Sequence, residues 1–268
     1  IFVNLIFPLR DKKSSDDISA LKEFYGVKTS FEVTGIKHNY PFGKLNFFNK
    51  LMFHVSHLLW SRKTINKLIR NLETKEVFFT RSDWIFYYLA KNNYKVLFEC
   101  HSLTKLRKIL INKSIKSPES KIIFLNEKLK SDSKIPEIYK NKMKVIQNGF
   151  NSEYFSDIDR IKKNPNEIIF TGNLIRHGDK RNFEYILDAF QDERLSNFSL
   201  KIIGDEIESI NIKNEILHKK INTEPFMSNK ETIENITKAT YGLLVNNSSD
   251  LHSRIYTSPL KYFEYIKA

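Results

Sequence analysis

At 268 residues the chain is longer than most single domains, so two domains are expected. Hydrophobic residues make up 41% and aromatic residues 13% of it, which is enough to fill packed cores. The only cysteine, Cys100, excludes an internal disulfide framework and fits a reducing compartment. The formal net charge of +13 is compatible with a solvated basic surface, a phosphate-rich ligand or an anionic membrane face.

Several motifs are absent from the sequence, and their absence limits the partners and the cellular location that we expect. It has neither zinc-finger spacing nor an RNP-like aromatic motif, and its basic residues are scattered, so nucleic acid is not expected as a partner. It has no signal-peptide pattern, and its longest apolar stretch, Leu51–Trp60, falls far short of the ~20 residues of a spanning helix. We therefore expect a cytoplasmic protein, with peripheral contact to an anionic membrane as an open alternative.

In residues 1–150, short β-rich runs alternate with helical patterns. The predicted strands are Ile1–Phe7, Phe31–Ile36, Val77–Thr80, Val96–Glu99, Ile122–Leu125 and Val145–Ile146. The predicted helices are Asp17–Tyr25, Phe47–Leu72, Asp83–Lys91, Leu103–Asn112 and Glu127–Ser133. Apolar strands separated by helices are typical of a parallel sheet covered on both faces. Residues 1–150 are therefore expected to form a Rossmann-like domain.

Residues 151–166 are polar and are predicted to be a linker, after which the alternation restarts. The predicted strands are Ile168–Thr171, Leu200–Ile203, Ile221–Phe226 and Tyr241–Val245. The predicted helices are Asn182–Phe190, Glu206–His218, Lys230–Lys238 and Ser258–Ala268. Residues 167–268 are thus expected to form a second Rossmann-like domain of an α/β fold. Because the chain opens in a strand and stops at a helix, we expect the fold to be incomplete at both ends.

Glycine is scarce, and this argues against two nucleotide-binding classes. The chain has 8 glycines and contains neither GxGxxG nor GxxxxGK[ST]. A Walker-type nucleotide hydrolase and a simple NAD enzyme are therefore not expected.

A basic loop follows the predicted strand Ile168–Thr171. Gly172 has no side chain at the tip of this strand, so the backbone could approach a ligand closely. Three cations follow: Arg176, Lys180 and Arg181. Fixed cations can stabilise the charge of a diphosphate leaving group without a metal ion. The alternative interpretation is a basic surface loop.

The last predicted helix has a start that could bind phosphate. Ser258 and Pro259 predict a capped helix start, whose free amides favour an anion. Three polar residues would follow one face: Thr257, Lys261 and Glu264, the last of which could accept hydrogen bonds from ribose hydroxyls. An apolar stripe would face the core: Leu260, Phe263 and Ile266. The alternative is a surface helix with a solvated glutamate.

His101 follows a predicted buried strand in the segment Phe98–Ser102. In open α/β sheets, ligands bind at the carboxyl ends of the strands. We therefore expect His101 to face a cleft between the domains. The alternative is a histidine whose hydrogen bonds are satisfied within a turn.

Together, these stretches resemble glycosyltransferase family 4 and its GT-B relatives over nearly the whole chain. Val145–Phe155 resembles the domain-exit motif V-I-P-N-G-V-D…F, and Gly172–Phe190 resembles a glycine turn and basic pair before a helix ending in Ala-Phe. Ser258–Ala268 resembles S-P-L-K-x-x-E-Y-[ML]-A. The resemblance implies a retaining, metal-independent GT-B enzyme without a cofactor. Its donor would be a nucleotide diphosphate sugar, and its acceptor a polysaccharide or glycolipid.

The resemblance also implies roles for single residues. Arg176 and Arg181 would bind the donor diphosphate; the family has lysine where this chain has Arg181, and Lys180 could take that role. Glu264 matches the second glutamate of an E-x7-E motif, which binds ribose. Tyr256 stands where the first glutamate is expected, so that half of the motif is absent.

His101 matches a family histidine that approaches the donor sugar, and it is assigned to the catalytic site with Arg176 and Arg181. The rest of the expected nucleotide-sugar site consists of Gly172, Lys180, Thr257, Ser258, Leu260, Lys261 and Glu264. Two other functions stay open, a nucleotide-sugar epimerase of the same fold and a non-catalytic nucleotide- or anion-binding protein.

Two further signals are interpreted as structural. Asp157 and Asp159 form a D-x-D pair, but they lie in the predicted linker and are read as solvated acids. The helix Phe47–Leu72 has an apolar stripe beside basic residues, which we interpret as packed core in preference to a membrane-surface helix. This stripe consists of Phe48, Leu51, Met52, Val55 and Leu59.

Overall fold

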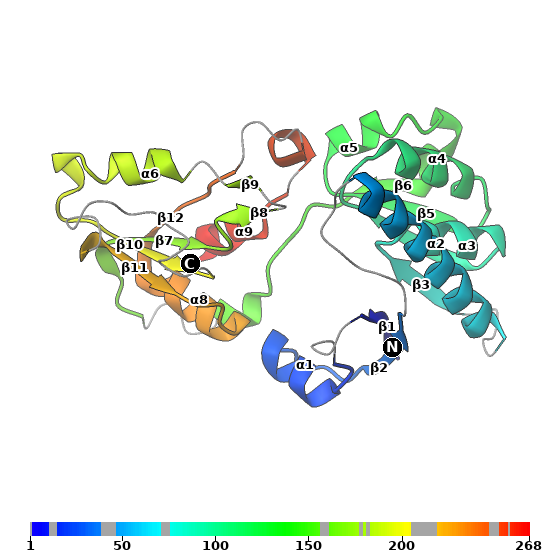
Figure 1. The fold of residues 1–268 in the computed structure, drawn as a ribbon, viewed down its shortest axis with the longest axis horizontal. Coiled ribbons are helices and arrows are strands. Elements are labelled where there is room, and N and C mark those ends of the chain that lie inside the picture. The colour runs from blue at the N-terminus through cyan, green and yellow to red at the C-terminus, as the bar shows by residue number, and fades with distance from the viewer. Residues whose placement is uncertain are drawn as a thin grey trace. The chain divides into compact units, whose positions relative to one another are not determined.

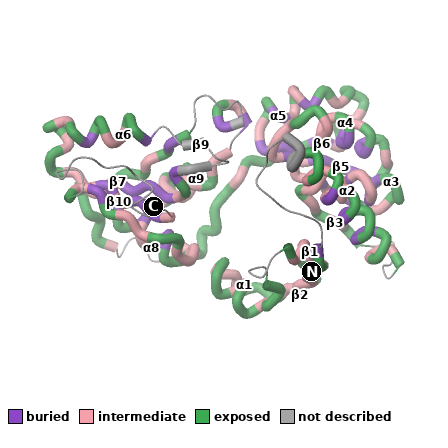
Figure 2. The backbone as a smooth tube through the Cα atoms, in the orientation of Figure 1, coloured by how far each residue is buried: buried purple, intermediate pink, exposed green. Residues whose placement is uncertain are grey.

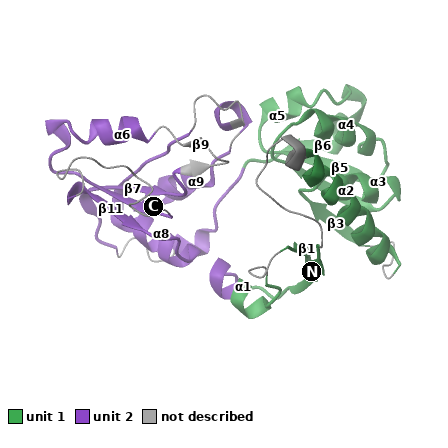
Figure 3. Ribbon diagram, in the orientation of Figure 1, with its two compact units in different colours: residues 1–21, 28–147 green, residues 22–27, 148–268 purple. Residues whose placement is uncertain are grey.

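The computed structural model describes residues 2–10, 15–38, 47–70, 76–155, 161–176, 179–180, 183–204, 219–246, 252–256 and 258–268. The side chains of residues 47–50, 175–176, 179–180 and 252 are not part of this description. The chain divides into two compact units, shown in Figure 3. Unit 1 consists of Ile1–Leu21 and Lys28–Gln147, and unit 2 of Lys22–Val27 and Asn148–Ala268.

Unit 1 contains two parallel sheets connected through helices (Figure 1). In the smaller sheet, β1 (Asn4–Leu9) pairs with β2 (Glu32–Lys37). The larger sheet has the order β3-β4-β5-β6, with the bounds Val77–Thr80, Lys95–Cys100, Ser120–Phe124 and Met143–Val145. The helices are α1 (Ile18–Tyr25), which the two units share, α2 (Phe47–Ile69), α3 (Asp83–Lys91), α4 (Lys105–Ser114), α5 (Glu127–Asp132) and the 3-10 helix η1 (Glu137–Lys142).

Three helices of unit 1 begin just after a strand because a polar side chain caps each start. Ser82, Thr104 and Asn126 accept hydrogen bonds from backbone N–H groups in the first turns of α3, α4 and α5. Beneath these helices, the ring of Phe98 on β4 stacks on Phe86 of α3, with ring centroids 4.9 Å apart. The capped helix starts therefore lie at the carboxyl edge of the larger sheet.

Unit 2 is built on one four-stranded parallel sheet of order β11-β10-β7-β12. The strands are β7 (Asn164–Thr171), β10 (Ser199–Ile203), β11 (Ile221–Glu224) and β12 (Ala239–Gly242). A short antiparallel hairpin, β8 (Ile175–Arg176) and β9 (Asp179–Lys180), follows β7. The helices are α6 (Glu184–Ala189), α8 (Asn229–Lys238), α9 (Leu260–Lys267), the 3-10 helices η2 (Ser152–Phe155) and η4 (Glu193–Leu195), and the π-helix η6 (His252–Tyr256).

Neighbouring residues of β7 point to opposite faces of the sheet in unit 2, and each face has its own core. Phe170 packs in a cluster with Leu174, Phe183, Phe190, Leu200, Ile202, Ile221 and Val245. Ile169 packs in a second cluster with Phe155, Ile203, Ile233, Ile236 and Ala239. The last three residues of β7 and most of β10 are buried, as the colours of these strands in Figure 2 show. This central sheet holds the carboxyl ends of β7 and β12 in fixed register.

The strands and helices predicted within the described ranges all have counterparts, which confirms an α/β fold with parallel sheets. Most of their bounds differ from the predicted ones by one to four residues. The difference at β7 bears on the linker, because this strand begins at Asn164, inside the stretch predicted as a linker, and η2 also lies in that stretch. The predicted helix Glu206–His218 and the pair Asp157 and Asp159 lie outside the described residues.

The packed-core interpretation of the α2 stripe is wrong. Four of its side chains are between 38% and 59% exposed: Leu51, Met52, Val55 and Leu59. The opposite face of the helix is the one that packs, with Trp60, Ser61, Thr64 and Ile65 at most 5% exposed. Because the helix packs through this opposite face, its apolar stripe is exposed to solvent.

Candidate functional site

The carboxyl edge of the larger sheet in unit 1 carries a cluster of charged side chains. The Glu99 carboxylate lies 2.5 Å from the Arg81 Nε and 3.1 Å from the His101 Nε2. Burial acts to raise the pKa of Glu99, but hydrogen bonds from His101 and Arg81 outweigh it and the pKa is lowered. Glu99 is only 13% exposed, whereas Arg81 is 65% exposed. The cluster is thus an anchored carboxylate that orients a histidine and an arginine at the surface.

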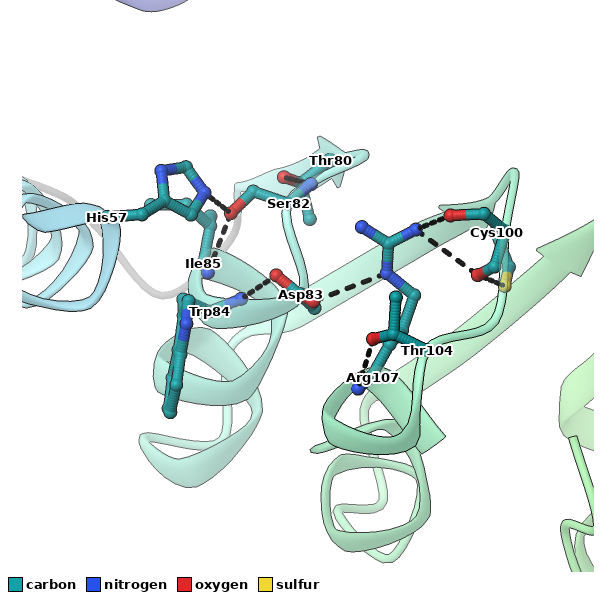
Figure 4. Close-up of polar contacts among 10 residues, drawn as sticks. His57, Thr80, Ser82, Asp83, Trp84, Ile85, Cys100, Thr104 and Arg107 are labelled. Atoms are coloured by element: carbon teal, nitrogen blue, oxygen red, sulfur yellow. Dashed lines mark hydrogen bonds and ion pairs between the residues drawn. The ribbon is translucent and has the colours of Figure 1, made fainter. Parts of the chain in front are cut away.

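Arg107 supports this edge from α4. Its Nε lies 3.2 Å from the Asp83 carboxylate, and its guanidinium also donates to the carbonyl and hydroxyl of Ser102. Figure 4 shows Arg107 between Asp83 and the loop that follows Cys100. Arg107 thus joins Asp83, at the start of α3, to Ser102. His101 lies between Ser102 and the buried Cys100, so its position in the chain is fixed on both sides.

A second histidine lies at the same edge. The Nε2 of His57 on α2 is 3.0 Å from the Oγ of Ser82, the residue that caps α3, and its ring stacks on Phe53 and Trp60. Burial lowers the pKa of His57, and nearby Asp83 opposes that shift. The sequence reasoning singled out His101 at this edge and missed Arg81 and Glu99. The strand-end rule applied to His101 also covers Arg81, which directly follows β3.

In unit 2, Gly172 and Gly204 end the neighbouring strands β7 and β10. Their φ angles are 130° and 108°, a region that favours glycine. The Gly172 N–H donates to the Ile203 carbonyl at 2.8 Å, and a Cβ on Gly204 would lie 3.4 Å from the Gly172 carbonyl carbon. The two glycines therefore let both strand ends turn in close contact.

The predicted diphosphate-binding loop begins at this turn. Arg176 and Lys180 lie on the hairpin β8–β9, where Ile175 pairs with Lys180 and Arg176 with Asp179. The pairing places the backbone of Lys180 opposite that of Ile175, four residues after the end of β7. Arg181 and Thr257 lie outside the described residues.

Helix α9 turns a polar face inward, which corrects the predicted apolar stripe. Leu260 and Ile266 are 51% and 68% exposed. Glu264 is 12% exposed, and its carboxylate lies 2.6 Å from the Lys261 Nζ. The inward face is set by Tyr265, whose ring fills the space left by the absent side chain of Gly242 on β12. Glu264 is accordingly a shielded, paired carboxylate and not a solvated one.

The predicted serine cap of α9 is also wrong. Pro259 occupies the N-cap position without a side-chain cap hydrogen bond. The Ser258 Oγ instead accepts a hydrogen bond from the Asn148 N–H at 3.3 Å, and the Asn148 Nδ2 donates to the Ser258 carbonyl at 2.6 Å. The serine hydroxyl is therefore turned toward Asn148 and away from the amides of α9. This contact nevertheless joins two motifs of the sequence analysis, Val145–Phe155, which contains Asn148, and Ser258–Ala268.

The described residues contain neither a candidate metal centre nor a membrane-spanning helix. Within the described ranges, no three or more His, Cys, Asp and Glu side chains are arranged to hold a metal ion. None of the helices in the part of the chain that the structure describes has the length and apolar character needed to cross a membrane.

No protein-family model matches the chain, and no curated protein matches its sequence. Solved structures do match. Sucrose-phosphate synthase from Thermosynechococcus elongatus matches over 90% of this chain and 74% of the synthase, with a TM-score of 0.56 and 11% identity. UGT89C1 from Arabidopsis thaliana, complexed with UDP-L-rhamnose, matches over 88% of this chain and 66% of that protein, with a TM-score of 0.51 and 10% identity.

The chain has a GT-B fold. The fold predicted from the motifs is thereby confirmed. Unit 1 contains the Arg81–Glu99–His101 cluster, and unit 2 contains the glycine turn and α9. At 10–11% identity the likeness establishes the fold.

Proposed function

We propose that the chain catalyses glycosyl transfer from a nucleotide diphosphate sugar to a glycan or lipid-linked acceptor. In this reaction the bond between the anomeric carbon and the diphosphate breaks, and the acceptor hydroxyl forms the new bond to that carbon. The hydroxyl proton passes to the leaving phosphate, on the same face of the sugar, so the configuration is retained. The first donor to test is a UDP sugar, because UGT89C1 was solved with one.

The observation that carries the proposal is the shielded Glu264 on α9, within a GT-B fold. A carboxylate that is 12% exposed and already paired with Lys261 loses little solvation when a ribose binds. It can accept hydrogen bonds from two neighbouring ribose hydroxyls while Lys261 balances its charge. Such a pair is well suited to hold a nucleoside and fix its orientation.

The diphosphate would be held by main-chain and cationic groups of unit 2. Gly172 would let the backbone approach the diphosphate, and Arg176 with Arg181 or Lys180 would neutralise the charge that develops on the leaving group. No metal ion or other cofactor is needed for that neutralisation. Three neighbours would complete the site beside α9: Thr257, Ser258 and Leu260. The Ser258 hydroxyl accepts from Asn148 and can donate its own proton to a phosphate oxygen.

His101 is proposed to contact the transferred sugar. The Glu99 carboxylate beside its Nε2 fixes the ring, so that the imidazole can form a hydrogen bond with a sugar hydroxyl. This role is one of binding and orientation, because the proton of the acceptor goes to the phosphate.

The decisive measurement is calorimetric binding of UDP and UDP sugars to Glu264→Gln and to alanine variants of Arg176, Lys180 and Arg181. Losing a charge-assisted contact costs about 1.5–3 kcal/mol, so a variant that loses one should bind roughly ten- to hundredfold more weakly. Arg194→Ala is the matched control, since Arg194 is an exposed arginine of unit 2 that pairs with Asp192. Unchanged affinity for UDP and UDP sugars in all four variants would refute the proposed site.

Product analysis separates this function from the two alternatives. Release of UDP with transfer or hydrolysis of the sugar supports a glycosyltransferase. Interconversion of the UDP sugar without release of UDP would identify an epimerase. Binding without any turnover, with each donor and acceptor class tried, would identify a non-catalytic nucleotide-binding protein.

A further inference from the structure

The exposed face of α2 has two chemically distinct halves. In the first half the exposed side chains are apolar: Leu51, Met52, Val55 and Leu59. In the second half four of the exposed side chains are cationic: Arg62, Lys63, Lys67 and Arg70, the last directly after the helix. Spacings of three, four and seven residues place both sets along one side of the helix. We call this surface the α2 face.

The charge of the α2 face is of one sign. The sequence from Phe47 to Ile69 contains no aspartate and no glutamate. Monomeric proteins rarely leave contiguous large apolar side chains exposed without a binding role. A face that combines such side chains with unopposed cations is therefore complementary to a surface that is apolar and anionic at once.

One hydrogen-bonded pair and one electrostatic interaction indicate the direction of α2 relative to α3. His57 lies against Ser82, which caps the start of α3, and Arg62 lies near Tyr88, further along α3. The two helices therefore run the same way, and the turns of α2 before His57 extend past the start of α3. The apolar half of the α2 face thus lies toward the carboxyl edge of the sheet, where Glu99 and His101 are found.

An aromatic cluster on α3 lies beside the cationic half. Trp84, Tyr87 and Tyr88 are partly exposed, and their ring centroids are 5.5 to 6.4 Å apart. The charge of Arg62 acts on Tyr88, where burial raises the pKa of the phenol and Arg62 opposes the rise. Tryptophan and tyrosine are enriched where proteins meet the interface between water and lipid, because their rings are amphipathic.

We propose that the α2 face docks unit 1 onto the surface of an anionic lipid bilayer. The apolar side chains of the first half would enter the boundary between headgroups and acyl chains, and the cations of the second half would bind anionic headgroups. Lysine and arginine suit this place because their long stems pack on apolar surface while their charges reach the headgroups. The docking is independent of the proposed glycosyl transfer, because it needs neither donor nor acceptor.

Vesicle sedimentation without any nucleotide tests the inference. The protein is expected to bind vesicles that contain phosphatidylglycerol, to bind pure phosphatidylcholine weakly, and to lose binding at high salt. Leu51→Ser with Leu59→Ser should reduce the partition coefficient roughly tenfold. Lys63→Gln with Lys67→Gln should reduce it about fivefold per cation, which corresponds to about 1 kcal/mol each, and should weaken the salt dependence.

The controls carry the same substitutions on other exposed positions of unit 1. Ile109→Ser with Ile138→Ser matches the apolar pair, and Lys95→Gln with Lys121→Gln matches the basic pair. Both controls should bind vesicles as the unchanged chain does, and circular dichroism should confirm that all variants are folded.

Three outcomes would overturn the inference: no binding to anionic vesicles, equal losses in the controls, or a dimer that only Leu51→Ser with Leu59→Ser dissociates. The last would show that a second copy covers the α2 face. Vesicle binding by a chain that transfers no sugar would leave the inference intact and refute the proposed function alone.

Discussion

Asn148 holds Ser258 through two hydrogen bonds. Its backbone N–H donates to the serine Oγ at 3.3 Å, and its side-chain Nδ2 donates to the serine carbonyl at 2.6 Å. The two residues are 110 positions apart, at the exit from the last strand of unit 1 and at the start of α9. Since α9 carries Lys261 and Glu264, the placement of the proposed ribose site depends on this contact.

Replacing Asn148 by alanine should loosen the start of α9. The variant keeps the backbone hydrogen bond and loses the one from Nδ2, which leaves the Ser258 carbonyl without that donor. We expect a loss of about 1–2 kcal/mol in the free energy of unfolding, measured by urea denaturation, and weaker UDP binding. Asn166→Ala, at an exposed position of the same unit, should change stability by less than about 0.5 kcal/mol. Equal stability of the two variants would contradict the proposed role of Asn148.

Elements with strong local signals could be predicted from the sequence. The predicted and the observed bounds of helix α3 agree. In the structure Ser82 caps its start, and Asn93, with a φ of 59°, follows its end in a conformation that asparagine tolerates. The strand β4 was recognised by its apolar run, with Val96 and Phe98 in the core. In both cases, the residues that determine the element lie within it or next to it.

Contacts between residues that are far apart in the chain could not be predicted from such local patterns. The orientation of α9 depends on a tyrosine that fits over Gly242, and its expected serine cap is engaged by a residue from another part of the chain. The partnership of Glu99 with Arg81 requires β3 and β4 to be neighbours in register, with Thr80 opposite Phe98. Nothing in the local pattern around Glu99 indicates that pairing, so this part of the candidate site was missed.

The Glu99 cluster should make stability depend on pH in the acid range. Hydrogen bonds from His101 and Arg81 hold the pKa of Glu99 below its ordinary value of 4.5 despite burial. A carboxyl group with a lowered folded-state pKa stabilises the fold above that ordinary value, and the contribution is lost as the pH falls through the folded-state pKa.

Glu99→Gln should therefore reduce the free energy of unfolding at neutral pH and have a much smaller effect well below pH 4.5, as measured by urea denaturation across this range. Glu119→Gln, at an exposed position of unit 1, serves as the control and should have little effect at either pH. A pH-independent loss in Glu99→Gln would show that packing, and not the ion pairs, accounts for the effect.

Cys100 should be unreactive in the folded protein. It is fully buried, and burial raises the pKa of its thiol to about 11, although the nearby charge of Arg107 opposes the rise. Near pH 8 the thiolate fraction should be at least about 100-fold below that of an ordinary cysteine, so alkylation should be slower by at least that factor. Because the chain has one cysteine, mass spectrometry after iodoacetamide treatment reads this site directly. Complete labelling in urea is the positive control, and rapid labelling without urea would contradict the burial.

Gly242 and Tyr265 form the tightest fit between α9 and the sheet of unit 2. A Cβ on Gly242 would overlap the tyrosine Cγ and Cδ2. The tyrosine ring is also held at its far end, because its hydroxyl accepts a hydrogen bond from the Thr171 N–H at 3.1 Å. The ring therefore cannot move aside without breaking a contact to the end of β7.

Gly242→Ala should displace α9 and reduce the free energy of unfolding by about 1–3 kcal/mol, because the new methyl group would overlap the Tyr265 ring and overpacking typically costs this much. Gly149→Ala is the matched control, since a Cβ there meets no atom within 4 Å; its effect should lie between none and a stabilisation of about 1 kcal/mol. Urea denaturation of both variants, and of Gly242→Ala combined with Tyr265→Ala, gives the coupling between the two residues. The combined variant should lose less stability than the two single losses added together, because removing the ring makes room for the new methyl group. Additive losses would show that Gly242 and Tyr265 act independently and that α9 is positioned by other contacts.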